Sequence, residues 1–483
     1  MLLQTLTSTS APDGTLYRRI AERICQLIDQ GTLRPGERVP SVRKLSEQQS
    51  VSIATVLQAY RFLENQGRIE ARPQSGYYVR ARLWSPPAEP ELYRTAPGST
   101  KVEVAELVME VIKGTRDPSL VRLGASLAAA ELFPNVQLHR TAASVARRHP
   151  VASNSYDPPP GNLSLRTQIA RRALESGCAL SPEDIVITCG ATEALHLCLR
   201  AVARPGDTIA IESPTFFGIL QMIESLGMRA CEIPTYPREG ICLEELALRL
   251  KCCRIKACVF STNFSNPLGS CMPDEKKKKL VEMLAERDIP LIEDDIYGNL
   301  CFSPNRPKVA KAFDTKGLVL LCDSFTKTLA PGYRIGWVAP GRFKSQVELL
   351  KFVSTSATAA LPQMAIADFL ANGSFDHHLR KIRRFYGAQV EHMTAAISRY
   401  FPEGTRVTRP RGGQVLWVEL PGDLDSLELY RRALAHHISI APGPIFSAKR
   451  KFRNCLRLSC GIPWSEKIET ALQRLGTLME GMR

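Results

Sequence analysis

The chain has 483 residues, of which 44% are hydrophobic and 23% charged, and this is the composition of a globular protein too long for one ordinary domain. No apolar run is long enough to span a bilayer, residues 1–10 do not have the pattern of a signal peptide, and the 14 cysteines form no metal-ligand or disulfide pattern. We therefore expect a cytoplasmic protein with no membrane association and no metal, and the net charge of +15 indicates an anionic partner.

Residues 14–82 form the first predicted domain and carry twelve Lys or Arg against six Asp or Glu. Helical spacing of apolar residues, serine caps and glycine stops predict its elements. These are a helix ending before Gly31, a short helix opened by Ser41, a third helix capped by Ser52 and ended by Gly67, and a hairpin of strands 68–71 and 76–80. This order predicts a winged helix-turn-helix, whose third helix enters the major groove of DNA while the hairpin tip contacts the backbone or the minor groove.

Two segments of this domain carry a resemblance to a known family. Pro-Gly-Glu-Arg-Val-Pro-Ser-Val-Arg-Lys-Leu (35–45) and Ala-Arg-Pro-Gln-Ser-Gly-Tyr-Tyr-Val (71–79) resemble the N-terminal domain of GntR-family regulators. The resemblance implies that the DNA-contact residues are Arg43, Ser52, Thr55, Arg72, Gln74 and Ser75. Ile53 stands where the family usually has an arginine, and this points to a different operator. The alternative is a charged three-helix module without a DNA role.

Residues 83–100 are interrupted twice by helix- and strand-breaking residues, at Pro86-Pro87 and at Pro97-Gly98. We interpret this stretch as a short Pro-rich linker, which limits how far the first domain can move. An amphipathic helical pattern from Val102 to Ile112 then opens the larger domain, residues 101–483.

Short apolar runs alternate with helical stretches in residues 101–483, which predicts an α/β fold. The candidate strands are 185–188, 208–212, 257–261, 290–292 and 319–321. A charged helix is expected over 273–287, and we interpret its run of lysines, 276–279, as a solvated helix face.

The segment 324–336 reads Ser-Phe-Thr-Lys-Thr-Leu-Ala-Pro-Gly-Tyr-Arg-Ile-Gly and follows a predicted strand. Lys327 has no acidic neighbour in it, and a lysine that burial deprotonates can attack a carbonyl. Ser324 and Arg334 could both bind one phosphate. A lone lysine in this place would more often be a surface residue. The whole segment, however, resembles the lysine segment of the fold-type I pyridoxal-phosphate enzymes, the aminotransferases.

Loops after the other predicted strands carry groups that such a cofactor needs. Gly190-Ala191-Thr192 opens a helix and offers backbone N–H groups to a phosphate, with the Thr192 hydroxyl beside them. Phe216 could stack on a pyridine ring. A carboxylate beneath the pyridine nitrogen keeps the ring an electron sink, and Glu293-Asp294-Asp295 supplies candidates.

The resemblance to aminotransferases assigns individual roles. It gives Asp294 to the pyridine nitrogen, with Asp295 as the alternative if the register differs by one residue. It gives the phenolic oxygen of the cofactor to Asn266 and Tyr297, and the phosphate to Ser324 and Arg334. Arg457 matches the arginine that binds a substrate carboxylate by two hydrogen bonds. Tyr156 matches a tyrosine that approaches the phosphate of the partner subunit.

A winged helix joined to an aminotransferase-like domain resembles the MocR-type transcriptional regulators. The implied fold is a winged helix-turn-helix plus a fold-type I domain, which has a mostly parallel sheet with helices on both faces and a smaller C-terminal α+β subdomain. Two functions stay open. In one, a DNA-binding regulator senses pyridoxal phosphate or an amino compound; in the other, a working aminotransferase carries an accessory head. The intact basic head favours the regulator, and an inactive second domain is disfavoured because no cofactor position is lost.

The expected partners follow from the same resemblance. They are a double-stranded DNA operator, an amino acid or other amino-compound effector, pyridoxal 5'-phosphate as cofactor, and a second copy of the chain. A homodimer is expected because fold-type I sites are usually built from two subunits and because two winged helices can read two half-sites.

Overall fold

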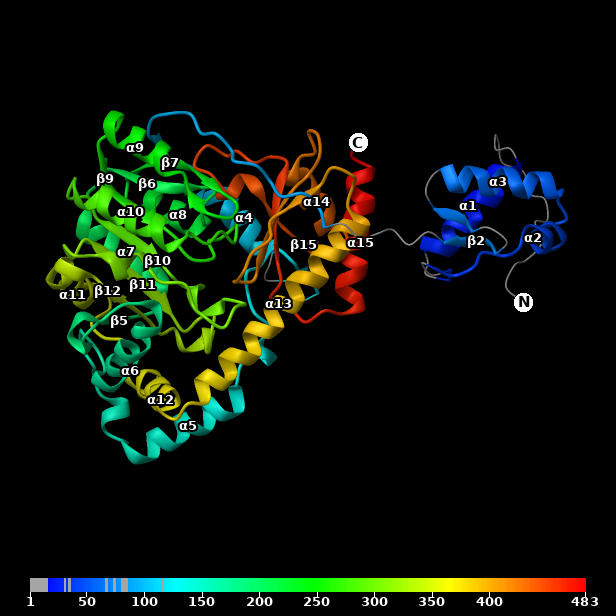
Figure 1. Ribbon diagram of the computed structural model, residues 1–483. Coiled ribbons are helices and arrows are strands. Elements are labelled where there is room, and N and C mark those ends of the chain that lie inside the picture. Colours follow the sequence, from blue (N-terminus) through cyan, green and yellow to red (C-terminus); the bar gives the residue numbers. More distant parts are fainter. Residues whose placement is uncertain are drawn as a thin grey trace. The chain divides into compact units, whose positions relative to one another are not determined.

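The computed structural model describes residues 16–29, 32–33, 36–65, 68–72, 75–79, 86–114, 117 and 119–483. The chain divides into two compact units, Met1–Ser85 and Pro86–Arg483, and Figure 1 shows the elements of each. Among the described residues, no helix is long and apolar enough to cross a membrane.

The first unit has the predicted winged helix-turn-helix elements. They are the helices α1 (Leu16–Asp29), α2 (Val42–Gln49) and α3 (Ile53–Asn65), and the antiparallel strands β1 (Ile69–Arg72) and β2 (Gly76–Val79). Ser41 caps α2 by accepting a hydrogen bond from the Lys44 amide, and Ser50 ends it in the left-handed conformation. Ile24 of α1, Tyr60 of α3 and other buried apolar side chains form one core beneath the three helices and the hairpin.

The second unit is built on a large sheet with the strand order β3-β7-β6-β9-β10-β11-β12-β5 among the described residues. Strands β7, β6, β9, β10 and β11 are parallel. Strand β12 pairs antiparallel with both β11 and β5, so β5 again runs in the direction of the parallel strands. The strands are β3 (Thr100–Lys101), β5 (Val186–Thr188), β6 (Thr208–Ser213), β7 (Arg229–Tyr236), β8 (Gly240–Ile241, paired with β7), β9 (Ile255–Phe260), β10 (Leu291–Asp294), β11 (Val319–Ser324) and β12 (Gly336–Ala339). All five strands predicted from the sequence are present.

Helices cover both faces of this sheet, so successive side chains of one strand enter different cores. On β6, Ile209 and Ile211 join the core formed with α7 (Ala191–Val202) and α8 (Phe217–Ser225). Ala210, between them, joins the core formed with α9 (Leu243–Cys252) and α10 (Asp274–Ala285). Burial on both faces explains why these strands read as continuous apolar runs.

The remaining elements complete the large domain and form the smaller subdomain. The helices are α4 (Ala105–Gly114), α5 (Asn135–Arg148), α6 (Leu163–Ala173), α11 (Lys344–Thr355), α12 (Ala360–Ala371), α13 (Ser374–Tyr400), α14 (Ser426–Leu434) and α15 (Glu466–Glu480). A four-stranded antiparallel sheet has the order β13 (Arg406–Val407), β14 (Val415–Glu419), β17 (Cys455–Ser459) and β16 (Ala441–Pro442). Strand β15 (Ile438–Ser439) pairs with β4 (Val121–Arg122). Helix α13 runs from the α12 region to α15 (Figure 1).

Residues 86–100, which the sequence assigned to a linker, belong to the second compact unit. The Tyr93 hydroxyl hydrogen-bonds Glu419 of β14 at 2.5 Å and Cys455 Sγ of β17 at 3.3 Å. The Thr95 hydroxyl donates to the Glu232 carbonyl of β7 at 3.0 Å. We call residues 86–100 the strap. It is held by side chains whose partners lie more than 130 residues away, which a local sequence pattern does not show.

Candidate functional site

A cavity of about 290 Å³ lies where the parallel strands β6, β9, β10 and β11 end. The carboxyl ends of parallel strands share one edge of a sheet, so loops far apart in the sequence meet there. The predicted site residues that line the cavity are Ala191, Thr192, Phe216, Asn266, Asp294, Tyr297, Lys327, Arg334 and Arg457. Ser324 and Tyr156 do not line it.

Lys327 lies three residues beyond the end of β11 and is half-buried at the cavity wall. Its Nζ donates to the Ser126 carbonyl at 2.5 Å. The Ser126 hydroxyl shares a 2.8 Å hydrogen bond with the Tyr297 hydroxyl, and Gln414 Nε2 donates to the Ser126 carbonyl at 3.1 Å. Ser126 therefore joins the predicted lysine and tyrosine, although no motif in the sequence singled it out.

The two adjacent aspartates at the end of β10 lie in different surroundings. Asp294 lines the cavity and accepts a 3.3 Å hydrogen bond from the Ile296 amide. Burial raises the pKa of Asp294 to about 6, against the opposing effects of that hydrogen bond and of Lys327. Asp295 does not line the cavity, because it points into a separate group of polar side chains.

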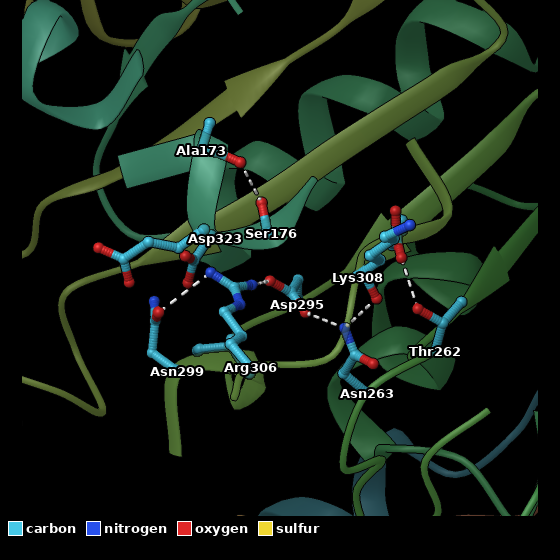
Figure 2. Close-up of polar contacts among 12 residues, drawn as sticks. Ala173, Ser176, Thr262, Asn263, Asp295, Asn299, Arg306, Lys308 and Asp323 are labelled. Carbon is cyan, nitrogen blue, oxygen red and sulfur yellow. Dashed lines mark hydrogen bonds and ion pairs between the residues drawn. The ribbon is translucent and has the colours of Figure 1, made fainter. Parts of the chain in front are cut away.

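This group, which we call the closed network, is drawn in Figure 2. Asn263 Nδ2 donates to Asp295 at 2.9 Å, and Arg306 pairs with the other oxygen of the same carboxylate. Arg306 Nη1 also donates to Asn299 at 3.0 Å. Burial raises the pKa of the nearby Asp323 to about 7, and the Arg306 charge opposes this rise. Within this network the Asp295 carboxylate is paired with Arg306 and is turned away from the cavity that Asp294 lines.

The closed network also corrects one sequence interpretation. Lys277, within the predicted solvated run 276–279, is fully buried, and its Nζ donates to Asn263 at 2.8 Å and to the Lys308 carbonyl at 2.6 Å. Lys278 and Lys279 are exposed as predicted. One face of α10 packs on the sheet, so a lysine on that face reaches inward even though its neighbours in sequence are solvated.

One end of the cavity has the donors that a phosphate requires. Helix α7 begins at Ala191, and Gly190 before it makes no side-chain cap to the helix. Gly190 has a φ of +83°, and a Cβ at this position would stand 2.6 Å from Arg334 Nη2, so the guanidinium lies directly against the start of the helix. First-turn N–H groups, the hydroxyls of Thr192 and Thr326 and an arginine together suit a phosphate dianion.

Ser324 is predicted to share this role, but it does not line the cavity. It ends β11, is 2% exposed, and its hydroxyl accepts a 3.3 Å hydrogen bond from the Thr326 amide. Thr326 takes the lining position instead. The chain turns out of the strand here, so the hydroxyl two residues later faces the cavity.

Arg457 lies on β17 and is 1% exposed. Its Nη1 donates to Asn266 Oδ1 at 3.0 Å, its Nη2 donates to the Gly124 carbonyl, and its guanidinium stands 5.1 Å from the Phe446 ring centre. Burial lowers its pKa to about 10, and within the described chain its Nε has no hydrogen-bond partner. A buried guanidinium with an unpaired N–H fits a ligand carboxylate.

The described residues of the first unit include all but one of the predicted DNA contacts, because Gln74 lies outside them. Arg43 is exposed on α2. Ser52 accepts from the Thr55 amide at 3.1 Å and bonds the Thr55 hydroxyl at 2.8 Å, so this pair caps α3. Ile53, at the start of α3, is 49% exposed. The exposed beginning of α3 is thus apolar where an arginine is usual in the family that the sequence resembles.

The hairpin residues have partners within the hairpin. The Arg72 guanidinium donates to Glu70 at 2.9 Å and stands 4.4 Å from the Tyr78 ring centre. The Ser75 and Tyr78 hydroxyls share a 2.6 Å hydrogen bond. Arg61, which the sequence analysis did not single out, is also exposed on α3.

In comparisons with known proteins, the two units match two different families. Residues 133–475 match the family described as aminotransferase class I and II, and residues 16–79 match the bacterial regulatory proteins of the gntR family. The chain belongs to the aminotransferase class I and II family. Its first unit adds the GntR domain, so the combination predicted from the two sets of motifs is confirmed.

Two relatives match this chain over nearly all of its length. The uncharacterized HTH-type transcriptional regulator YdcR of Escherichia coli is 40% identical over 96% of this chain and 99% of its own length. The similarly described YjiR of the same organism is 39% identical over 96% and 98%. Both relatives are described as HTH-type transcriptional regulators, and each is matched over nearly its whole length.

Solved structures match the second unit. The multiple substrate aminotransferase of Thermococcus profundus is 30% identical, with a TM-score of 0.73, over 78% of this chain and 95% of its own. The predicted fold-type I architecture is therefore confirmed. The aminotransferase family is generally dependent on pyridoxal phosphate, and the residues around the cavity fit that group: the donors at the start of α7 suit its phosphate, and the Asp294 carboxylate suits its pyridine nitrogen.

Proposed function

We propose that this protein is a DNA-binding transcriptional regulator whose second unit holds pyridoxal phosphate at Lys327 and responds to an amino compound. One observation carries the proposal: Lys327, Asp294 and Arg457 line a single cavity in a chain that also has a complete winged helix-turn-helix. A regulator needs both a ligand site and a DNA-binding domain, and a plain enzyme does not need the latter.

Each end of the cavity has an assigned task in this proposal. The start of α7, Thr192 and Arg334 would hold the phosphate, and Phe216 would lie on the pyridine ring. Asp294 would sit at the ring nitrogen, while Tyr297 and Asn266 would serve the phenolic oxygen. When bound, the cofactor supplies an electrophilic carbon and an electron sink. Burial raises the Asp294 pKa to about 6, still below neutral pH, so the carboxylate is mostly ionised there, as a partner of a protonated ring nitrogen must be.

The ligand would bind between two cations. Arg457 would bind its carboxylate by a fork of hydrogen bonds, and its amino group would lie at Lys327. Arg457 donates to the carbonyl of Gly124, a neutral acceptor that a ligand carboxylate would replace. Lys327 donates to the carbonyl of Ser126, a contact that attachment of the cofactor would replace. Exchange of a neutral acceptor for a charged one gives the ligand a differential interaction with the site, which a sensor requires.

The strap is a route by which this event can reach the DNA-binding unit. Tyr93 contacts Cys455, two residues before Arg457 on β17, and its ring stands 5.0 Å from that of Phe452. The strap is also the part of the second unit through which the chain continues towards the first. A shift of β17 on ligand binding would therefore change the contacts of Tyr93. Tyr93→Phe should keep ligand affinity but reduce the ligand's effect on DNA affinity.

We also propose a homodimer formed through the second unit. Tyr156 is 89% exposed, and Leu349, Phe352 and Val353 form an exposed apolar stripe on α11. Burial of such a stripe in a second copy would remove it from water, and Tyr156 is then free to reach the partner's cavity. Light scattering of the full chain should give a dimer. Phe352→Asp should weaken it, whereas Leu248→Asp on α9 should not.

The cofactor part of the proposal is tested on Lys327. The purified protein should absorb visible light, and borohydride should fix the cofactor to the peptide that contains Lys327. Lys327→Ala should lose both signals. If this variant kept the same absorption and the same modified peptide, the assignment would be wrong.

The DNA part is tested by anisotropy titrations of duplex operator DNA with the full chain. Arg43→Ala should weaken binding and lower its salt dependence by about one unit of slope per lost phosphate contact. Arg72→Ala should have a smaller effect, because its guanidinium already pairs with Glu70. The visible spectrum should stay unchanged in both. A spectral change with normal DNA affinity would contradict the division of tasks, and useful transaminase turnover without DNA binding would favour the enzyme alternative.

A further inference from the structure

The part of the cavity that the proposed cofactor contacts do not use is apolar. Six lining residues share this character: Val111, Ile112, Leu127, Phe217, Ala441 and Ile445. They come from α4, from the loop after β4, from α8 and from the β16 region, so several separate elements bring the same kind of side chain to one place. Such convergence is what a binding pocket for an apolar group requires.

The charged groups of the cavity are already accounted for. Among the described lining residues, the cations are Lys327, Arg334 and Arg457, and the only carboxylate is that of Asp294. Each has a task in the proposed function, at the ligand amine, the phosphate, the ligand carboxylate and the ring nitrogen. Among the described residues of this chain, a second carboxylate on the ligand would thus find no free cation at the cavity, and an ammonium would find no free carboxylate.

The polar lining groups do not change this balance. The Ser126 hydroxyl is already hydrogen-bonded to Tyr297 and Gln414, and the Ser261 amide donates to the buried carboxyl of Glu212 at 3.1 Å. An ionised side chain that enters the apolar part would lose water without gaining a partner, which is strongly unfavourable. An aliphatic or aromatic side chain gains free energy by the same burial.

We propose that the effector of this protein is an amino acid with an aliphatic or aromatic side chain, and that Val111, Ile112 and Leu127 contribute to this selectivity. The inference rests on the proposed function for the ligand's amino and carboxylate ends. It adds the chemical class of the third substituent, which the cofactor residues do not specify.

Leu127 offers a clean test because it lines the cavity yet is 54% exposed, so a longer charged side chain can be placed there without loss of the core. Leu127→Arg adds the cation that the cavity lacks for an acidic ligand side chain. Leu248→Arg is the matched control, since Leu248 is 56% exposed on α9 and does not line the cavity.

The experiment uses the full chain loaded with pyridoxal phosphate. Visible-spectrum titrations would compare L-leucine and L-phenylalanine with L-glutamate and L-lysine. Calorimetry with 4-methylpentanoate and glutarate, which lack the amino group, would measure the preference without turnover. The apolar ligands should bind at least about tenfold more tightly, a difference that one poorly solvated charge easily exceeds. Leu127→Arg should reduce this ratio by favouring glutamate and glutarate, and Leu248→Arg should leave it unchanged.

Three results would overturn the inference: equal or tighter binding of glutamate or lysine, no response to any of the four amino acids, or an unchanged ratio in Leu127→Arg. None of them decides the proposed function. Cofactor attachment to Lys327 and DNA binding by the full chain are measured separately, so a regulator with a charged effector would pass those tests and fail this one.

Discussion

Two regions meet at the end of β10 and differ in how their charges are partnered. On one side, Asp294 faces the cavity with a single long amide hydrogen bond, and Arg457 keeps an unpaired Nε. On the other side, Asp295 is held by both Asn263 and Arg306 in the closed network. A buried polar group is costly unless it is paired. The two carboxylates therefore differ, because Asp295 has an ion pair and Asp294 has none among the described residues. The two guanidinium groups do not differ in this way, since Nε of Arg457 and Nε of Arg306 both lack a hydrogen-bond partner in the described chain.

The largest effect should come from opening the closed network. Arg306→Met leaves Asp295 buried without its cation, and breaking a buried pair in this way costs about 3–5 kcal/mol. Denaturant unfolding of the cofactor-free protein measures it. Arg342→Met is the control: its 2.7 Å pair with Asp288 is exposed at the surface, so less than about 1 kcal/mol should be lost. Similar losses in the two variants would mean that burial does not set the difference between the regions.

Replacing Asp294 should stabilise the cofactor-free protein, whereas replacing Arg306 should destabilise it. The pKa of Asp294 is raised from 3.8 to about 6, so the native state holds this proton more tightly than the unfolded state does. The stability of the cofactor-free protein should therefore fall as pH rises from about 4 to 6, by at most about 3 kcal/mol at this site. Asp294→Asn should stabilise the cofactor-free protein at pH 8 and have little effect at pH 4.

The same substitution should weaken pyridoxal-phosphate binding by about 10- to 100-fold, the range for one hydrogen bond to a charged group. Asp295→Asn should weaken the cofactor far less and should destabilise the protein instead. A thermal-shift series against pH and a fluorescence titration of the cofactor measure the two effects. Equal or reversed effects of the two substitutions on cofactor affinity would contradict the assignment of Asp294 to the ring nitrogen.

The smallest expected effect tests whether Lys277 belongs to the closed network. Lys277→Ala should cost about 1–3 kcal/mol, because Asn263 and the Lys308 carbonyl each lose a buried donor. Lys278→Ala, one residue along the same helix but exposed, should change stability by no more than about 0.5 kcal/mol. Urea unfolding of both variants decides it. An equal loss of stability at the two positions would mean that Lys277 is solvated, as the sequence suggested.

The sequence by itself determined much of this protein. Apolar runs located the five predicted strands because both faces of the sheet are covered. The segments around Lys327 and around residues 35–45 identified the two families, because a dense local motif can be recognised without knowing the fold. The order of the helices and hairpin in the first unit also followed from local signals, because caps and turns depend on neighbouring residues.

Only the tertiary structure decided which of these residues meet. Ser126 lies 201 residues before Lys327, and no local pattern connects them. The structure turned Asp294 and Asp295 apart, moved Ser324 behind Thr326, buried Lys277 and packed the strap onto the second unit. The physical reason is the same in each case. The sequence specifies which groups are polar or charged, but the side chains and carbonyls that satisfy a buried group come from distant elements, and the fold alone brings them within hydrogen-bond distance.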